Sequence, residues 1–330
     1  MWYDIGVIFL KSGVFMNRIR LLPLFLMVFF ICLLCGGCES TQGYIDFTNM
    51  RPRAVLDKQT GEASDKERAL RVGFASVLSP REARQSYQKM VDYISMKMNR
   101  PAILIQRKTY EELNMMLAGG DCDIAFISTG AYTSYHGMQP IEILTMTQTY
   151  GSVFYKAYLV VPADSDIWEF SQLRGKVMAF TDPISYSGRL VVDYKLLDEY
   201  NTTPEQFFQR CFYTYNHDKS VWAVANNLAD VAGIDNQVYE HDLKNNPELA
   251  KKLRVIEETD PVPTGPVVIR SDFPTAEKEQ IREIFYNMSN EPTLKPFMTQ
   301  VMIDQFVPAS PSAYDELRRK YNQLARLPGD

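Results

Sequence analysis

Hydroxyl groups gather in a short segment, Ser185-Tyr186-Ser187, between an expected strand at 176–181 and an expected helix at 188–200. Backbone N–H groups left free at such a helix start, together with the positive end of the helix dipole, attract an oxyanion. Serine hydroxyls there add further hydrogen-bond donors. The segment therefore predicts an anion site, although a serine that only caps the helix would produce the same pattern.

Two more polar residues stand at the ends of predicted strands. His217 comes just after a strand at 211–215, and a nearby negative charge would favour its protonated form, which donates hydrogen bonds. Asp235 ends a strand at 231–235. Ligands of α/β sheets bind outside the carboxyl ends of the strands, so both residues are candidates for the same site. A structural hydrogen bond for His217 and a loop-capping carboxylate for Asp235 remain the alternatives.

A third candidate segment ends an earlier strand at 123–128. Ser128 and Thr129 supply hydroxyl and N–H groups, and Tyr132 follows them one helical turn later. These groups would face the same cleft if the strand ends there, whereas Tyr132 as a core aromatic is the structural alternative.

Several chemistries are excluded by what the sequence lacks. Its three histidines include no pair at metal-ligand spacing, and the glycine patterns of dinucleotide and P-loop sites are absent. Ser185-Tyr186-Ser187-Gly188 does not match a hydrolase nucleophile elbow. A net charge of −5 without a long basic block argues against nucleic-acid binding. We therefore expect no enzyme activity, no metal and no cofactor.

The elements that must position these residues alternate between strand and helix. The 330 residues, 46% hydrophobic and 23% charged, suffice for two medium domains with real cores. A β-α-β-α-β pattern runs through 70–128 and a second α/β unit begins near 157, which predicts mostly parallel sheets covered by helices. Extended segments near Tyr158 and Pro261 join the two units, so we expect two lobes with a cleft between them: lobe 1 at 70–157 and 260–330, lobe 2 at 158–259.

The first 38 residues have the features of an export signal. A basic segment at 17–20 precedes an uncharged run at 21–34, which is shorter than the roughly 20 residues of a spanning helix. Gly36-Gly37-Cys38 resembles a bacterial lipobox. We expect a lipoprotein signal at 1–37, a diacylated Cys38 and a flexible tether at 38–69. Simple cleavage or an uncleaved anchor are the alternatives, and Met1 and Met16 are the two candidate starts of translation.

An ordered series of short motifs across residues 70–325 resembles the phosphate/phosphite/phosphonate-binding proteins of ABC importers, a PhnD-like family with the type II periplasmic solute-binding fold. The series begins with Val72-Gly73-Phe74 and Asp123-Ile124-Ala125-Phe126. It continues with Leu173-Arg174-Gly175-Lys176, Asp182-Pro183-Ile184-Ser185-Tyr186-Ser187-Gly188, Asn216-His217-Asp218, Val231-Ala232-Gly233-Ile234-Asp235 and Pro261-Val262-Pro263.

The resemblance implies roles for particular residues. Ser185, the Tyr186 backbone and Ser187 would hold the oxygens of a small phosphorus oxyanion. His217, the lobe-one aromatic Tyr132 and Asp235, near the ligand's substituent, would complete the site. The binding protein would deliver its ligand to a membrane permease driven by a separate ATPase. We expect a monomer outside the cytoplasm; sensing through a separate signalling partner is the alternative function.

Two positions depart from the family pattern. The family usually has threonine where Tyr186 stands, so either this side chain turns away and only its N–H serves, or the pocket is reshaped. The family also tends to have Gly-Pro where Ser128 and Thr129 stand, which gives this chain two additional donors. Both changes leave the identity of the ligand open, and the sequence leaves open whether Cys122 and Cys211 form a disulfide.

Overall fold

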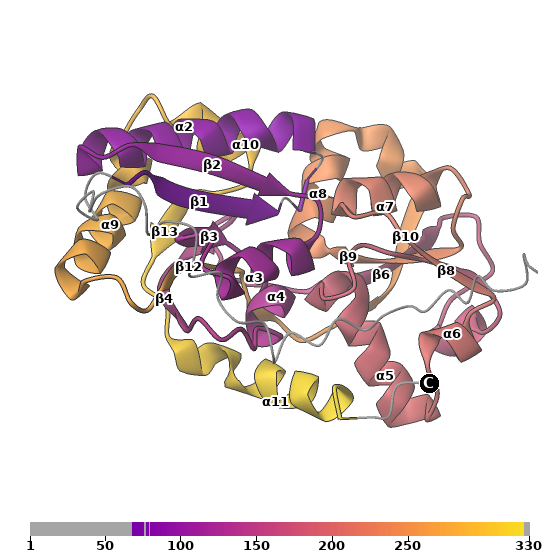
Figure 1. Ribbon diagram of the computed structural model, residues 1–330. Coiled ribbons are helices and arrows are strands. Elements are labelled where there is room, and N and C mark those ends of the chain that lie inside the picture. The colour runs from indigo at the N-terminus through magenta and orange to yellow at the C-terminus, as the bar shows by residue number, and fades with distance from the viewer. Residues whose placement is uncertain (1–67, 76, 79, 327–330) are drawn as a thin grey trace, which may run out of the picture. The chain divides into compact units, whose positions relative to one another are not determined.

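The computed structural model describes residues 68–75, 77–78 and 80–326. Cys38, the expected signal at 1–37 and all but the last two residues of the expected tether lie outside this range. The described part contains two α/β lobes, each built on its own sheet (Figure 1).

A six-stranded sheet forms the first lobe, in the order β13-β4-β12-β3-β1-β2. Its side chains alternate between the two faces, as the period of two in a strand requires. In the third strand Ile124 and Phe126 enter one core cluster, whereas Ala125 enters another on the opposite face. The strands are β1 (Leu70–Ala75), β2 (Ala102–Arg107), β3 (Ile124–Phe126), β4 (Ile141–Gln148), β12 (Pro266–Arg270) and β13 (Gln305–Val307).

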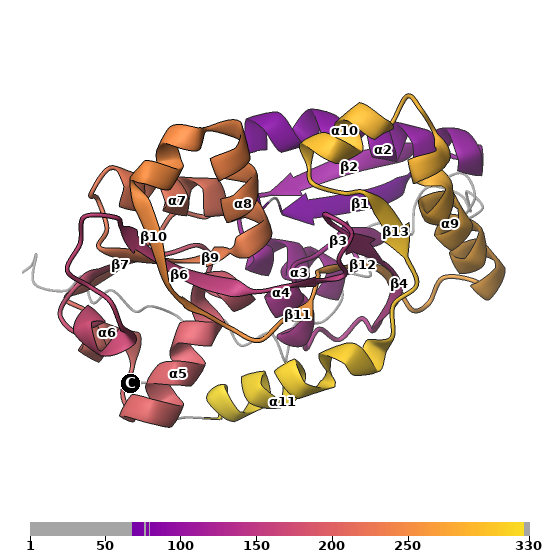
Figure 2. The ribbon, with the colours of Figure 1, turned by 180° about the vertical axis from the view of Figure 1, so that it is seen from behind.

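Helices cover both faces of this sheet. Apolar side chains of α2 (Pro80–Met98), α9 (Thr275–Asn287) and α10 (Lys295–Gln300) pack on one face, where α2 also contacts α9 and α10 (Figure 2). The other face packs against α3 (Tyr110–Ala118) and the short α4 (Thr129–Thr133). Thr109 begins α3 with a capping box, because its hydroxyl accepts the Glu112 N–H and the Glu112 carboxylate accepts the Thr109 N–H.

The second lobe contains a five-stranded sheet in the order β10-β6-β9-β7-β8. Its faces also alternate: Leu159 and Val161 pack with α5 and α6, whereas Val160 packs with α7 and α8. The strands are β6 (Ala157–Pro162), β7 (Val177–Phe180), β8 (Arg210–Tyr213), β9 (Val231–Asp235) and β10 (Leu253–Glu258). The helices are α5 (Val191–Tyr200), α6 (Pro204–Phe207), α7 (His217–Ala225) and α8 (Asn236–Asn245).

Short helical turns also occur in the described chain. A π-helical turn, η3 (Tyr186–Leu190), leads directly into α5. The others are the 3₁₀ turns η2 (Phe170–Leu173), η4 (Pro247–Lys251), η5 (Met288–Asn290) and η6 (Pro311–Tyr314).

Both sheets are mixed, so the expectation of mostly parallel sheets is wrong in this respect. In the first sheet only the β1–β2 and β1–β3 pairs are parallel, and in the second only β7–β8 and β7–β9. The reason is the path of the chain between lobes. Strands β1 and β3 run towards the second lobe. Strand β12 begins where the chain returns from that lobe and runs away from it, so β12 must be antiparallel to β3.

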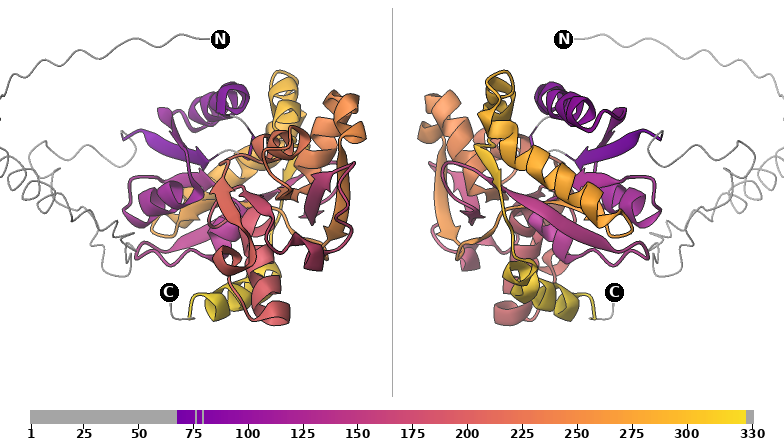
Figure 3. Two further views of the ribbon diagram at one scale, coloured as in Figure 1. Left: turned by 90° about the vertical axis from the view of Figure 1, so that its right-hand side faces the viewer. Right: turned by 90° about the vertical axis from the view of Figure 1, so that its left-hand side faces the viewer.

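Two chain segments connect the lobes and pair with each other. Strand β5 (Phe154–Tyr155) and strand β11 (Val262–Pro263) form an antiparallel ribbon. The final helix, α11 (Asp315–Leu324), contacts α4 in the first lobe and α5 in the second (Figure 3). The lobe boundaries at 157/158 and 259/260 remain our proposal, which this ribbon supports.

The two cysteines of the described chain are free thiols. Cys122 is buried in the first lobe, and Cys211 lies on β8 in the second. The sequence left open whether these two cysteines form a disulfide, and in the structure they do not.

Candidate functional site

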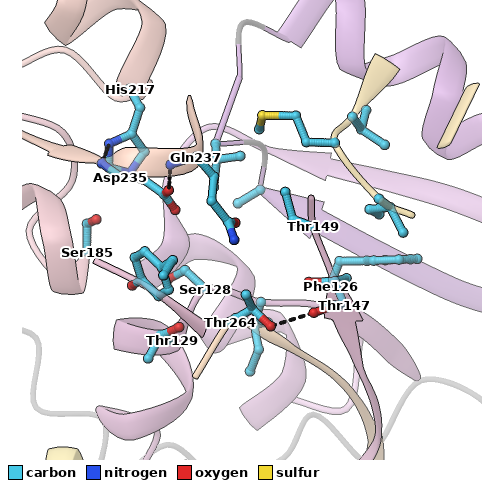
Figure 4. A pocket seen from close by; sticks show the side chains of 18 of the residues that line it. Phe126, Ser128, Thr129, Thr147, Thr149, Ser185, His217, Asp235, Gln237 and Thr264 are labelled. Atoms are coloured by element: carbon cyan, nitrogen blue, oxygen red, sulfur yellow. Dashed lines mark hydrogen bonds between the residues drawn. The ribbon is translucent and has the colours of Figure 1, made fainter. Parts of the chain in front are cut away.

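A cavity of about 110 Å³ lies where strand ends of the two lobes meet. Figure 4 shows side chains of the second lobe on one side and side chains of the first lobe on the other. Most of its polar lining consists of hydroxyl groups. The described polar residues that line it are Tyr87, Tyr110, Ser128, Thr129, Thr147, Thr149, Tyr155, Ser185, Ser187, His217, Asp235, Gln237 and Thr264.

The predicted hydroxyl segment lies on the second-lobe side of the cavity. The Ser185 hydroxyl accepts the Gly188 N–H at 3.1 Å, so Ser185 is the N-cap of the helical turn, and its own proton is left to donate. Ser187 also lines the cavity and is only 1% exposed. The turn is tight: a Cβ on Gly188 would lie 2.5 Å from the Thr181 Cβ. Both serines therefore line the cavity, and their role in binding an anion stays a prediction.

Tyr186 turns its side chain away from the cavity. Its ring packs edge-on against Tyr155, with ring centroids 6.1 Å apart, in a cluster that includes Leu317 of α11. Of the two possibilities that the sequence left open, the first therefore holds: the phenol is part of the core, and only the backbone of Tyr186 is near the site.

His217 begins α7, where its ring is 2% exposed and lines the cavity. Burial lowers its pKa to about 3, so the imidazole is neutral, contrary to the protonated form that the sequence favoured. Its Nδ1 accepts the backbone N–H of Asp235 at 3.1 Å. A neutral ring with an accepting Nδ1 carries its proton on Nε2, so His217 remains a hydrogen-bond donor without carrying charge.

Asp235 has a structural role and also lies at the cavity. Its carboxylate accepts the Gln237 N–H at 2.8 Å and so caps α8, while the residue also lines the cavity. Burial raises the pKa of this carboxyl to about 7, even though the helix N–H groups partly oppose the shift. Near neutral pH a substantial fraction of Asp235 is therefore an uncharged carboxylic acid, which can itself donate a hydrogen bond.

The first-lobe residues of the prediction divide into two groups. Ser128 and Thr129 line the cavity. The Ser128 hydroxyl accepts the Ala131 N–H at 3.1 Å and keeps its own proton, whereas the Thr129 hydroxyl donates to the Pro263 carbonyl at 2.8 Å. Thr129 can therefore offer a ligand its backbone N–H but not its hydroxyl proton.

Tyr132 is not among the residues that line the cavity, which corrects its expected place beside the ligand. Its ring packs edge-on against Tyr314 at a centroid distance of 4.9 Å, and the Arg318 guanidinium lies over the ring at 4.9 Å. The cause is the C-terminal segment from η6 to α11, which covers this part of α4 and incorporates the ring into the core. The core alternative for Tyr132 therefore describes its position.

Sequence reasoning missed several lining residues, above all Tyr110 and Tyr155. Tyr110 begins α3 just after β2, so the rule that sites gather at strand ends would have found it. Its hydroxyl is buried without a hydrogen-bond partner in the described structure. Tyr155 and Thr264 lie in the two connecting segments, where no local pattern marks a binding residue.

The lobes contact each other directly around the cavity. The backbone N–H of Tyr110 in the first lobe donates to the Asp182 carboxylate in the second at 3.1 Å. In the other direction, the His217 N–H donates to the Val77 carbonyl at 3.0 Å. The lobes also approach each other at Gly130, where an added Cβ would lie 2.0 Å from the Ile184 carbonyl oxygen.

No lysine or arginine occurs among the described residues that line the cavity. An anion held there would be stabilised by hydroxyl groups, N–H dipoles and a neutral imidazole. Such fixed dipoles stabilise buried anions without a formal positive charge.

The comparison with protein families agrees with this geometry. Residues 72–314 match the model of the family described as "ABC transporter, phosphonate, periplasmic substrate-binding protein". The chain belongs to this family. Members of this phosphonate-binding family are exported substrate-binding components that work with an ABC permease, and they are not enzymes.

Individual relatives have low sequence identity to this chain. The phosphonates-binding periplasmic protein of Escherichia coli (strain K12) is 24% identical over 262 residues, which cover 77% of this chain and 76% of that protein. A binding protein component of an ABC phosphonate transporter from Pseudomonas aeruginosa has a TM-score of 0.69 at 21% identity, with 79% of this chain and 87% of that one covered. PhnD1 from Prochlorococcus marinus, in complex with methylphosphonate, has a TM-score of 0.70 at 17% identity, with coverage of 78% and 99%.

These structural neighbours establish the two-lobed type II periplasmic-binding-protein fold for the chain. Within residues 68–326, apart from positions 76 and 79, no helix has the length and apolar character to cross a membrane.

Proposed function

We propose that the cavity binds a small phosphorus oxyanion (a phosphonate, phosphite or phosphate) for delivery to the permease. The observation that carries this proposal is a small cavity between two lobes, lined by hydroxyl groups and a neutral imidazole. The donors would be the hydroxyls of Ser128, Ser185 and Ser187, together with Nε2–H of His217. Backbone N–H groups at Thr129 and Tyr186 and the neutral acid form of Asp235 would complete the set.

The binding cycle requires no covalent chemistry. A ligand that contacts both lobes stabilises the arrangement in which they meet, because it interacts more favourably with that state than with a separated one. The permease would recognise this closed state, accept the anion and move it with energy from a separate ATPase. A single copy of the chain supplies both walls of the cavity, so the cycle would operate in a monomer.

Sensing is the alternative role for the same binding step. It would require a separate signalling partner in place of the permease. Deleting the gene for this chain distinguishes the two roles: transport predicts that phosphonate uptake stops, whereas sensing predicts unchanged uptake and a lost transcriptional response.

Cys38 would anchor the protein to the membrane through a diacyl group. Two acyl chains suffice for stable anchoring, since each buried CH₂ contributes about 0.8 kcal/mol. The Cys38→Ser variant should therefore leave the membrane fraction and appear in the soluble fraction of the cell envelope. An immunoblot of the two fractions measures this, and a variant that stays with the membrane would refute the lipid anchor.

A thermal-shift screen tests the ligand class. The panel would contain phosphate, phosphite, methylphosphonate, 2-aminoethylphosphonate, sulfate and a sulfonate. A ligand at 100 times its dissociation constant adds about 2.7 kcal/mol to the free energy of unfolding, which is an easily visible shift. Stabilisation by at least one phosphorus oxyanion and not by sulfate or the sulfonate is expected. No response across the panel would contradict the proposed function.

The Ser187→Ala variant tests the anion segment itself. It should lose one hydrogen bond to a charged ligand, worth about 1.5–3 kcal/mol, and so bind roughly 10- to 150-fold more weakly. Isothermal titration calorimetry with the ligand found in the screen measures the change. Ser171→Ala removes an exposed hydroxyl from the same lobe and serves as the matched control. Unchanged affinity in Ser187→Ala would exclude this hydroxyl from the site.

A further inference from the structure

The cavity has a chemically different side, away from the hydroxyl segment. Phe126, Thr147 and Thr149 lie opposite Ser185 and His217 in Figure 4. Apolar side chains from the segment 301–303, between α10 and β13, complete this first-lobe side.

Two of the polar side chains on this side already have partners within the protein. The Thr264 hydroxyl donates to the Thr147 carbonyl at 2.6 Å. The Gln237 amide, which extends from the second lobe towards the middle of the cavity in Figure 4, donates to the Phe154 carbonyl at 3.3 Å. The next lining residue after Thr264 is Gly265, which has no side chain to offer. The groups that remain for a substituent on this side are an amide and hydroxyls, none of which carries a charge.

Charge is distributed as unevenly as hydrogen bonding. Asp235 is the one carboxylate among the described residues that line the cavity. It lies beside His217 on the second-lobe side, where it caps α8. An ammonium group buried on the far side would meet an amide, hydroxyls and hydrocarbon, and no carboxylate. A buried charge without a paired partner is strongly disfavoured.

The size of the cavity sets a further limit. Its volume of about 110 Å³ is far below the roughly 300–1,000 Å³ of sites for drug-sized ligands. Once the oxyanion occupies the hydroxyl side, the remaining space fits only a few heavy atoms.

We propose that this cavity selects phosphonates whose substituent is short, apolar and uncharged, and discriminates against aminoalkylphosphonates. The inference rests on the proposed function, because it assigns the hydroxyl side to the phosphorus oxygens. Gln237 is then a specificity-determining residue: its uncharged amide occupies the place from which a carboxylate would pair with an ammonium.

The test compares three ligands by calorimetry on the purified full-length protein: methylphosphonate, ethylphosphonate and 2-aminoethylphosphonate. The wild-type protein should bind the better alkylphosphonate at least about 100-fold more tightly than 2-aminoethylphosphonate. In Gln237→Glu, 2-aminoethylphosphonate should gain and both alkylphosphonates should lose affinity, so that the ratio narrows by at least about tenfold. Gln305→Glu, which adds the same charge at an exposed position on β13, should leave the ratio unchanged.

Equal or tighter binding of 2-aminoethylphosphonate by the wild-type protein would overturn the inference and leave the proposed function intact. Failure of all three ligands, together with phosphite and phosphate, would overturn the proposed function and the inference with it. The affinities of the three ligands for the wild-type protein test the inference even if Gln237→Glu does not fold.

Discussion

Replacing Gly130 with alanine should abolish ligand binding while both lobes remain folded. Gly130 lies in α4 of the first lobe. A Cβ built there would meet the Ile184 carbonyl oxygen at 2.0 Å and the Tyr186 nitrogen at 2.6 Å, and its three nearest atoms all belong to the second lobe. These are backbone atoms, which cannot move aside as a flexible side chain can. The added methyl group therefore obstructs the meeting of the lobes and nothing within its own lobe.

The expected size of the effect follows from population arithmetic. A shift of about 5.5 kcal/mol is enough to turn a 99:1 equilibrium between two states into 1:99. An overlap of this severity should exceed that, so the affinity for methylphosphonate should fall by at least about 1,000-fold. Within the helix, alanine is favoured over glycine by roughly 1 kcal/mol, so thermal stability should not decrease.

Two measurements separate this outcome from simple misfolding. Calorimetry should detect no binding, whereas the melting temperature without ligand should remain near that of the wild-type protein. Small-angle X-ray scattering should show a larger radius of gyration for the variant when methylphosphonate is present. Gly119→Ala is the matched control, because its Cβ would lie 3.3 Å from its nearest neighbour, the Met115 carbonyl oxygen of its own helix, and affinity should be unchanged. Wild-type affinity in Gly130→Ala would mean that the lobes need not approach here.

Local patterns predicted most of the elements that carry the site. The strand predicted at 231–235 corresponds to β9 with the same bounds, and the second α/β unit begins with β6 at Ala157, as expected. The eight-residue strand β4 (Ile141–Gln148) was missed, because its half-buried sequence mixes threonine, glutamate and glutamine with apolar residues. Helix α8 was missed because most of its residues are polar and it buries only Gln237, Val238 and Tyr239.

The site was predictable only where one strand end defines it. Ser185, Ser187 and His217 follow strands of the second lobe, and all three line the cavity. The contacts between lobes were not predictable, since the approach of Gly130 to Ile184 depends on how two independently folded units meet. The same limit applies to Tyr132, whose ring is withdrawn by a C-terminal segment nearly 200 residues away in the chain.

The Asp235→Asn variant should remove most of the pH dependence of ligand binding. Burial raises the pKa of this carboxyl to about 7, so it is neutral below that pH and ionised above it. Its surroundings offer no compensating cation among the described cavity residues: His217 is neutral, and the nearby phenols of Tyr110 and Tyr155 have pKa values raised well above their usual range. An ionised Asp235 would repel a bound anion, so binding above pH 7 requires the uptake of one proton.

The uptake of one proton determines how steeply the dissociation constant changes with pH. In the wild-type protein the dissociation constant should rise by about tenfold per pH unit above pH 7, or about 100-fold between pH 7 and pH 9. The asparagine of the variant would still accept the Gln237 N–H and cap α8, because asparagine is as good an N-cap as aspartate. The ligand's own second ionisation affects both proteins equally, so the difference between their profiles isolates Asp235.

The Asp235→Asn substitution should also change the free energy of unfolding of the ligand-free protein. A folded-state pKa above the unfolded value means that the folded protein binds more protons between about pH 4 and pH 7, so its free energy of unfolding decreases as the pH rises through that window. Asp235→Asn should therefore be more stable than the wild-type protein at pH 8, by roughly 2–4 kcal/mol at most, and similar to it near pH 4. Asp198→Asn, at an exposed position on α5, provides the control for both measurements. Parallel pH profiles of binding for the wild-type and Asp235→Asn proteins would show that this carboxyl does not face the ligand.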